Sequence, residues 1–200
     1  MNKTFVLALG AATFALAGCE TMDGSMDDGM RTSASASSNT VVQVGGADMF
    51  ANRTIVQNAV NSPIHTTLVK AVQAAGLVDT LIPAGPFTVF APTDEAFGRV
   101  PTATVNMLMM PENKAALAKV LTYHVVPARI TAADIMARIK AGGGTATYTT
   151  VQGEPLTFKM MSGSVMIAGM GGSSAYVTQA DVMQSNGVIH VVNGVLTPSM

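Results

Sequence analysis

The segment that decides the fold is Gly85-Pro86-Phe87-Thr88-Val89-Phe90-Ala91-Pro92-Thr93-Asp94-Glu95-Ala96-Phe97. Residues 87–90 favour β structure and are apolar on both faces, which predicts a short strand that is buried on each side. Pro92 cannot donate a hydrogen bond to a neighbouring strand and restricts the residue before it, so the strand must end there. Thr93 or Asp94 can then cap a helix whose first turn buries Phe97. The segment therefore predicts a strand that passes directly into a helix through a proline corner.

Two later segments have a similar buried character. They are Leu121-Thr122-Tyr123-His124-Val125-Val126-Pro127 and Asn186-Gly187-Val188-Ile189-His190-Val191-Val192-Asn193-Gly194-Val195-Leu196-Thr197-Pro198. The first predicts a helix end followed by a short strand that Pro127 closes. In the second, residues 188–192 predict a buried strand. The dipeptide Asn186-Gly187 before it predicts a hairpin with a type I′ turn, because such turns need positive φ at both central positions.

In this order and spacing, the three segments resemble the fasciclin (FAS1) domain. The first resembles its N-terminal box, the second its Tyr-His motif and the third its C-terminal box, and the resemblance extends from about Thr54 to Pro198. It implies an α+β fold, in which a twisted, largely antiparallel β-wedge or sandwich packs against helices from the N-terminal half. It also implies an adhesion or interaction module rather than an enzyme, with a protein or an extracellular polysaccharide as its partner.

The composition fits a single domain with a substantial core. The chain has 200 residues, of which 48% are hydrophobic, and its formal net charge is −1. Its single cysteine excludes an intramolecular disulfide and any zinc site built on several cysteines. The 11 basic residues form no stripe and are not interleaved with aromatic residues, so no nucleic-acid partner is expected.

The N-terminus has the pattern of a bacterial lipoprotein signal. Lys3 precedes an apolar run, residues 5–17, which is too short to span a bilayer and leads into Gly-Cys. We expect residues 1–18 to be removed and Cys19 to be acylated, so that the lipid bilayer becomes a partner through several acyl chains. Glu20 follows in place of an aspartate, which favours the outer membrane as the location in the cell envelope. An ordinary secretory peptide with an incidental cysteine is the alternative.

A flexible tether is expected between the signal and the domain. Residues 19–44 are mostly small and polar and offer little that could pack, so the domain is predicted to span residues 45–200. Methionine recurs in this tether at Met22, Met26 and Met30, beside acidic residues. Because thioether sulfur suits Cu(I), the alternative function is a periplasmic protein that binds Cu(I) or buffers oxidants.

Helices are predicted through the N-terminal half of the domain. Residues 49–60 have a loose helical spacing of apolar side chains. Ser62 before Pro63 is a good signal for the start of a second helix, which Gly76 would end. His65 falls in the first turn of that helix, where we expect it to be solvated.

The C-terminal half changes from helix to strands. Thr131 and Asp134 have the spacing of a capping box, and the three glycines at 142–144 end the helix that it opens. Strands separated by turn residues are then expected at 147–151, 156–160, 165–168, 175–178 and 188–192. The glycine-rich Gly169–Ser174 has no helix after it and is expected to be a hairpin loop.

No catalytic, metal or cofactor site is predicted. The chain lacks the Gly-x-Ser-x-Gly, phosphate-binding and His-Glu-x-x-His patterns. His124 and His190 lie in apolar contexts, and no carboxylate or cysteine is spaced to complete a metal site with them. We therefore expect both rings to be buried, neutral and hydrogen-bonded inside the fold. The residues expected to be structural are Phe87, Phe90, Pro92, Thr93, Asp94, Phe97, Asn186, Gly187 and His190.

The resemblance also implies four binding residues. Integrin-binding members of the family use an aspartate followed by a branched aliphatic residue, together with residues around the Tyr-His motif. Asp181 and Val182 occupy the first of these places, and Tyr123 and His124 occupy the second. The alternative is that Val182 packs in the core and that Asp181 caps the turn toward Asn186.

Overall fold

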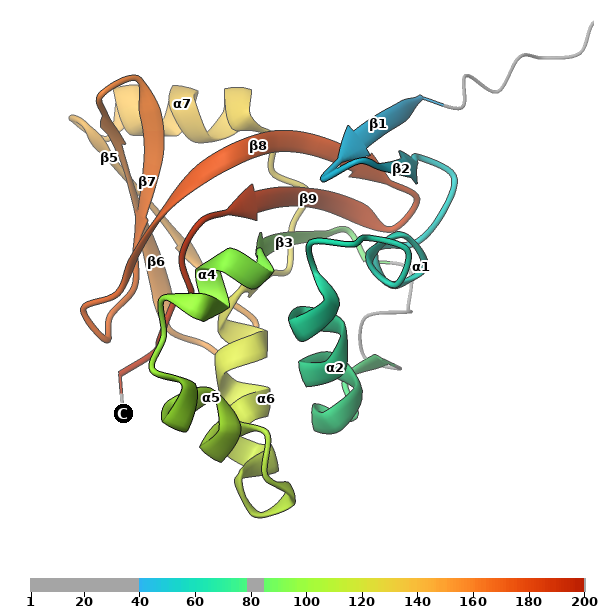
Figure 1. The fold of residues 1–200 in the computed structure, drawn as a ribbon. Helices are drawn as coiled ribbons and strands as arrows, with labels where there is room; N and C mark the ends of the chain where they lie inside the picture. The colour runs from blue at the N-terminus through green and yellow to red at the C-terminus, as the bar shows by residue number, and fades with distance from the viewer. Residues whose placement is uncertain (1–39, 79–84, 200) are drawn as a thin grey trace, which may run out of the picture. The chain divides into compact units, whose positions relative to one another are not determined.

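Two β-sheets and several helices make up the part of the chain that this computed structural model describes, residues 40–78 and 85–199 (Figure 1). The strands are β1 (Val41–Val44), β2 (Ala47–Phe50), β3 (Phe87–Pro92), β4 (Val125–Val126), β5 (Thr145–Thr149), β6 (Pro155–Met161), β7 (Ser164–Ala168), β8 (Ser174–Gln184) and β9 (Gly187–Val192). The helices are α1 (Ile55–Ala59), α2 (Thr66–Ala75), α4 (Asp94–Gly98), α5 (Thr102–Leu108), the 3₁₀ turn η1 (Pro111–Asn113), α6 (Lys114–Tyr123) and α7 (Ala132–Ala141). Within these residues β1 pairs with β2, and a seven-stranded sheet has the order β4-β3-β9-β8-β7-β6-β5. This architecture confirms the predicted α+β fold class.

The large sheet contains one parallel pair among its described strands, β3 with β9, in which Phe90 lies opposite His190. The other neighbouring strands of this sheet pair in antiparallel fashion. The two edge strands of this sheet are β4 and β5. They come together where the N–H of Val151, just after β5, donates to the carbonyl of Val125 in β4 at 2.7 Å. The sheet is therefore largely antiparallel and nearly closed on itself, which shields part of both edges.

β3 is buried on both faces because each face meets a different core cluster. Val89 and Ala91 belong to a cluster that also contains residues of α2 and α6. Phe90 belongs to a second cluster with residues of α7, and its ring centroid lies 5.3 Å from that of Phe158. In Figure 1, α2 and α6 lie at the bottom of the view and α7 lies at the top. Because helices cover both faces of β3, the side chains on both faces are buried, which explains why its sequence carries apolar residues on both faces.

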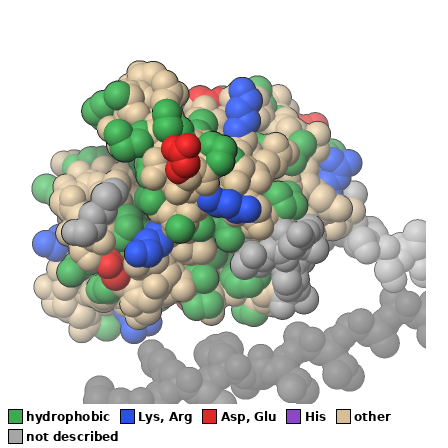
Figure 2. Space-filling model, turned by 90° about the horizontal axis from the view of Figure 1, so that it is seen from below, with side chains coloured by type: hydrophobic (Ala, Val, Ile, Leu, Met, Phe, Trp, Pro, Cys, Tyr) green, Lys and Arg blue, Asp and Glu red, His purple; other side chains and the backbone are tan. Residues whose placement is uncertain are grey.

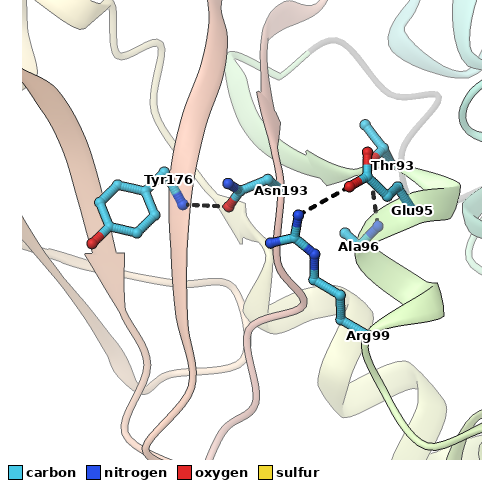
Figure 3. A network of polar contacts seen from close by, with 6 residues as sticks. All are labelled: Thr93, Glu95, Ala96, Arg99, Tyr176 and Asn193. Carbon is cyan, nitrogen blue, oxygen red and sulfur yellow. Dashed lines mark hydrogen bonds and ion pairs between the residues drawn. The ribbon is translucent and has the colours of Figure 1, made fainter.

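The strand and the helix of the proline corner form where the sequence predicted them. β3 ends at Pro92, and the Thr93 hydroxyl accepts a hydrogen bond from the Ala96 N–H at 3.3 Å, which caps α4 (Figure 3). The same view shows Glu95 and Arg99 paired at 3.0 Å along α4. Both of these side chains are largely exposed, so this ion pair contributes little to stability.

Asp94 lies in the first turn of α4 but caps α2. Its carboxylate accepts hydrogen bonds from the N–H groups of Thr66 (3.2 Å) and Thr67 (2.7 Å) and from the Thr66 hydroxyl (2.8 Å). Although burial raises the pKa of Asp94, these bonds bring it below its ordinary value. The predicted helix start at Ser62 and Pro63 is therefore wrong. The helix begins at Thr66, because a distant carboxylate satisfies its first N–H groups.

The first described residues form a β-hairpin, which corrects two predictions. The sequence predicts a tether up to Val44, but that residue ends β1 and is 1% exposed. It also predicts Met49 on a helix, whereas Met49 lies on β2 and is 2% exposed. Two glycines with positive φ, Gly45 and Gly46, form the turn without strain. Because Val44 and Met49 both enter the core cluster with α2, the folded region begins by Val41.

The hairpin between β8 and β9 forms, but the prediction of a type I′ turn is wrong. Neither Asn186 nor Gly187 has positive φ. The Asn186 side chain instead accepts a hydrogen bond from the Ile55 N–H at 3.0 Å, at the start of α1. Gly187 lies where β9 passes so close to β3 that a Cβ atom would collide with the Phe87 carbonyl oxygen. Asn186 and Gly187 therefore allow contacts with distant segments, at Ile55 and Phe87, and do not supply the positive φ angles of a type I′ turn.

Gly187→Ala is expected to lower the free energy of unfolding by about 1–3 kcal/mol, because the methyl group would force β3 and β9 apart. Gly98→Ala is the matched control. Gly98 is exposed on α4 and no atom lies within 4 Å of the added Cβ, so this change should stabilise the fold by about 0.5–1 kcal/mol. Denaturant unfolding of both variants measures the two effects, and equal stability would contradict the close approach of β3 and β9.

Asn193 continues the pairing of β8 with β9 just beyond the end of β9. The Tyr176 N–H donates to the Asn193 side-chain oxygen at 2.9 Å, and the Asn193 N–H donates to the Tyr176 carbonyl at 3.1 Å (Figure 3). On the other side of β9, the Thr93 N–H donates to the Val192 carbonyl at 3.3 Å. These bonds hold the start of the C-terminal segment beside α4.

Candidate functional site

His124 fastens the C-terminal segment to the end of α6. It is the C-cap residue of that helix and is 3% exposed. Its Nε2 accepts a hydrogen bond from the Leu196 N–H at 2.9 Å, so its Nδ1–H donates to the Val120 carbonyl at 2.7 Å. Burial lowers the pKa of this imidazole from 6.5 to about 4. The ring is therefore neutral, and neither nitrogen is free to bind a metal or a ligand.

His190 joins three segments inside the second core cluster. Its ring is completely buried and stacks on the ring of Phe90 at a centroid distance of 5.5 Å. Nδ1 accepts from the Asp181 N–H at 3.3 Å, and Nε2–H donates to the Ile130 carbonyl at 2.9 Å. Burial lowers the pKa of His190, against the opposing effects of the Ile130 carbonyl and the Asp181 carboxylate. Both nitrogens are thus used by the fold.

Tyr123 uses its hydroxyl to join α6 to β6 and to the loop between β7 and β8. Its residue surface is completely buried. The hydroxyl donates to the Pro155 carbonyl at 3.0 Å and accepts from the Met170 N–H at 2.8 Å. Burial raises the pKa of this phenol, so it stays protonated and can keep donating.

Asp181 and Val182 lie at the irregular part of β8, where its register with β9 shifts. Asp181 has a φ of 58°, and its carboxylate accepts a hydrogen bond from the Ala132 N–H at 2.8 Å, at the start of α7. It therefore caps a helix and does not cap the turn toward Asn186, so the part of the alternative that concerns Asp181 is wrong. Val182 is completely buried in the core cluster with α2 and α6.

Three of the four residues implied for binding have almost no exposed surface. They are Tyr123, His124 and Val182, with exposed fractions of 0%, 3% and 0%. A macromolecular partner could touch their side chains only if this part of the domain opened. Asp181 is half-buried and reaches the surface. A binding role for the four remains a prediction, with Asp181 as the member that a partner could contact directly.

His65 is buried, so the prediction of a solvated side chain is wrong. It is 2% exposed and precedes α2, and its Nδ1 lies 2.7 Å from the Ser62 hydroxyl. Its Nε2 makes no hydrogen bond of good geometry with the described residues. Burial lowers the pKa of His65, while the Asp94 carboxylate and the Ala91 carbonyl act in the opposite direction. The ring fills the space between α2 and the proline corner.

An apolar cavity of about 180 Å³ lies between the helices and one end of the sheet. Its walls come from α1, α2, α6, β3 and β4, and its apolar lining includes Val56, Ala59, Leu68, Val69, Val72 and Phe87. Val60 and Val151 also line it and are 56% and 42% exposed, so the cavity reaches the surface at these side chains. Sequence reasoning did not find this cavity. The apolar spacing of α2 indicated a buried face but not the space left beside it.

One face of the molecule carries apolar side chains without a large field of one charge. Figure 2 shows one face, on which hydrophobic side chains reach the surface at several places and charged side chains are scattered. Several of the most exposed apolar residues are methionines, namely Met107, Met110, Met136, Met160, Met161 and Met170. This face offers no basic stripe of the kind that nucleic acids require.

Other predicted sites fall outside the described residues or find no support within them. Cys19, Met22, Met26 and Met30 all lie in the part of the chain that is not described. Across 40–78 and 85–199, no three His, Cys, Asp or Glu side chains are grouped so that they could hold a metal ion. No helix in these ranges has the length and apolar character needed to cross a bilayer.

Comparison with known proteins places this chain beside one family. A family model described as the fasciclin domain matches residues 63–198. Protein sll1483 of the cyanobacterium Synechocystis sp. is 42% identical over 193 residues, which cover 96% of this chain and 91% of that protein. The immunogenic protein MPB70 of Mycobacterium bovis is 33% identical over 145 residues, which cover 70% of this chain and 66% of that protein.

Two further similarities concern larger proteins. The transforming growth factor-beta-induced protein ig-h3 of Sus scrofa is 36% identical over 131 residues, which cover 66% of this chain but 17% of that protein. A solved FAS1 domain pair from the insect cell adhesion molecule fasciclin I superposes with a TM-score of 0.65 at 18% identity. That match covers 78% of this chain and 57% of the solved chain, so it shows a shared fold.

Proposed function

Because the chain belongs to the fasciclin domain family, we propose that it is a non-catalytic adhesion or interaction module of the cell envelope. Its partner is a protein or an extracellular polysaccharide. The observation that carries this proposal is the use of the motif side chains: His124, His190 and Tyr123 bond to carbonyl and N–H groups of the fold itself. A general acid or base must reach a substrate, and these groups do not. The motif side chains therefore stabilise the fold, and we expect a partner to bind residues on the surface of the domain.

The shared fold supports the same function from another direction. The insect protein whose FAS1 pair superposes on this chain is named as a cell adhesion molecule. Asp181 is the surface-reaching member of the residues that the family resemblance implies for binding. Its carboxylate is already bonded to the start of α7, so a partner would contact its remaining oxygen and the neighbouring backbone.

A binding assay on cell envelopes tests this function. The fluorescently labelled full-length chain is mixed with purified envelope fragments, and we expect saturable binding that unlabelled chain displaces. Protease treatment of the fragments should abolish binding to a protein partner, whereas periodate treatment should abolish binding to a polysaccharide. The absence of any saturable, displaceable binding to untreated fragments would contradict the proposal.

We also propose that Cys19 anchors the chain to the outer membrane through acyl chains. This anchor follows from the signal pattern before Cys19. Cys19→Ser is expected to move the protein from the detergent phase to the aqueous phase in Triton X-114 partitioning, because acylation needs the thiol. The unchanged chain is the control in the same cells. Detergent partitioning that survives the substitution would show that another feature holds the protein on the membrane.

A further inference from the structure

The apolar cavity is larger than an ordinary packing defect and is large enough to hold a ligand. Its volume of about 180 Å³ exceeds the roughly 150 Å³ at which an apolar protein cavity stays dry and binds benzene. An empty cavity of this kind destabilises a fold in proportion to its volume, because the lining atoms lose their contacts. The domain therefore gains stability when an apolar group of about six carbon atoms fills it.

The described part of the lining does not favour a ligand with polar groups at its inner end. No Lys, Arg, Asp or Glu is among the described residues that line the cavity. The Thr122 hydroxyl donates to the Ala118 carbonyl at 2.7 Å, and both nitrogens of His124 are bonded within the fold. Gln73 also lines the cavity, but it is exposed. A polar ligand group placed inside would lose its hydrogen bonds to water without replacing them.

The mouth of the cavity favours an elongated ligand over a compact one. Val60, at the end of α1, and Val151, between β5 and β6, both line the cavity and remain 56% and 42% exposed. A ring that filled the interior alone would leave these two side chains in water. A hydrocarbon chain that enters the cavity and continues across them buries apolar surface at both places.

We propose that this cavity binds the hydrocarbon end of a free single-chain acyl compound. The methyl end lies among the buried side chains of Leu68, Val89 and Leu121, the middle of the chain lies on Val60 and Val151, and the polar head stays in water. The walls are formed by secondary-structure elements on both sides, so the site exists before the ligand arrives. This binding does not depend on the adhesive function proposed above.

Calorimetric titration of the full-length chain with straight-chain carboxylates tests the proposal. From butanoate to octanoate, affinity is expected to rise about fourfold for each added methylene group, as the chain fills the cavity. Toluene is small enough to occupy only the interior of the cavity. It should also bind, but more weakly than dodecanoate. Affinity that is independent of chain length would overturn the proposal, as would binding to phosphatidylcholine vesicles without binding to free dodecanoate.

Three variants locate the binding. Ala59→Phe places a ring in the cavity and should abolish binding of both toluene and dodecanoate, whereas Ala74→Phe, on the exposed face of α2, should leave both unchanged. The double variant Val60→Ser with Val151→Ser should weaken dodecanoate about three- to tenfold and leave toluene unaffected. Unfolding curves establish that each variant is folded. Equal dodecanoate binding by the two phenylalanine variants would place the binding elsewhere and overturn the proposal.

Discussion

His190→Ala is expected to lower the free energy of unfolding by about 3–5 kcal/mol. The change removes a fully buried ring that stacks on Phe90. It also leaves the Asp181 N–H and the Ile130 carbonyl without their bonds to the imidazole. Because β8, β9 and the segment before α7 meet at this ring, no single neighbour can move to fill the space.

Denaturant unfolding at neutral pH measures this loss. Met170→Ala is the control, since Met170 is 58% exposed and its removal should change stability by less than about 0.5 kcal/mol. If His190→Ala proves too unstable to purify, His190→Gln retains a donor for the Ile130 carbonyl and should lose less. A His190→Ala protein as stable as the control, but impaired in binding envelope fragments, would show that the residue serves recognition instead.

The strand and helix of the proline corner could be predicted because several local signals agree there. A run that is apolar on both faces, a proline that stops it and a threonine that caps the next helix each depend on neighbouring residues, and β3 and α4 follow them. The capping box of Thr131 and Asp134 forms for the same reason. Signals of this kind need no knowledge of the rest of the chain.

Predictions failed where a distant segment supplies the deciding contact. α2 begins at Thr66 because Asp94, 28 residues later, caps it. His65 is buried, with Ala91 and Asp94 of the proline corner close enough to affect its pKa. The type I′ turn was wrong because Asn186 is held by Ile55, which lies 131 residues earlier in the chain. The spacing of apolar residues along the chain carries no information about these long-range contacts. Local rules alone therefore predict the wrong helix start, the wrong exposure and the wrong turn.

The candidate site was less predictable than the fold. The burial of His124 and His190 follows from the apolar residues beside them in the sequence, but the hydrogen-bond partners of the two rings come from four separate segments. The apolar cavity has walls from five secondary-structure elements. A cavity is the space that packing leaves unfilled, so it can be found only after the elements are placed in three dimensions.

The same buried imidazoles predict that acid destabilises the domain. The folded pKa of His124 is about 4, whereas the unfolded chain should titrate near 6.5. Above pH 6.5 the ring is neutral in both states, so its contribution to stability is complete. As the pH falls from 6.5 to 4, the unfolded chain binds a proton that the folded chain does not, and stability is lost over this window. The difference between the two pKa values corresponds to about 3 kcal/mol.

Unfolding curves at pH 7, 5.5 and 4 are therefore expected to show a progressive loss of about 3 kcal/mol or more. The pKa values of His190 and His65 are also lowered by burial, so these residues act in the same direction. His124→Gln is the informative variant. Its amide oxygen can accept from the Leu196 N–H but takes up no proton, so the variant should start less stable at pH 7 and lose less on acidification. Parallel pH profiles for the variant and the unchanged chain would mean that His124 is protonated in the folded domain, and that its neutral, doubly bonded state does not persist in solution.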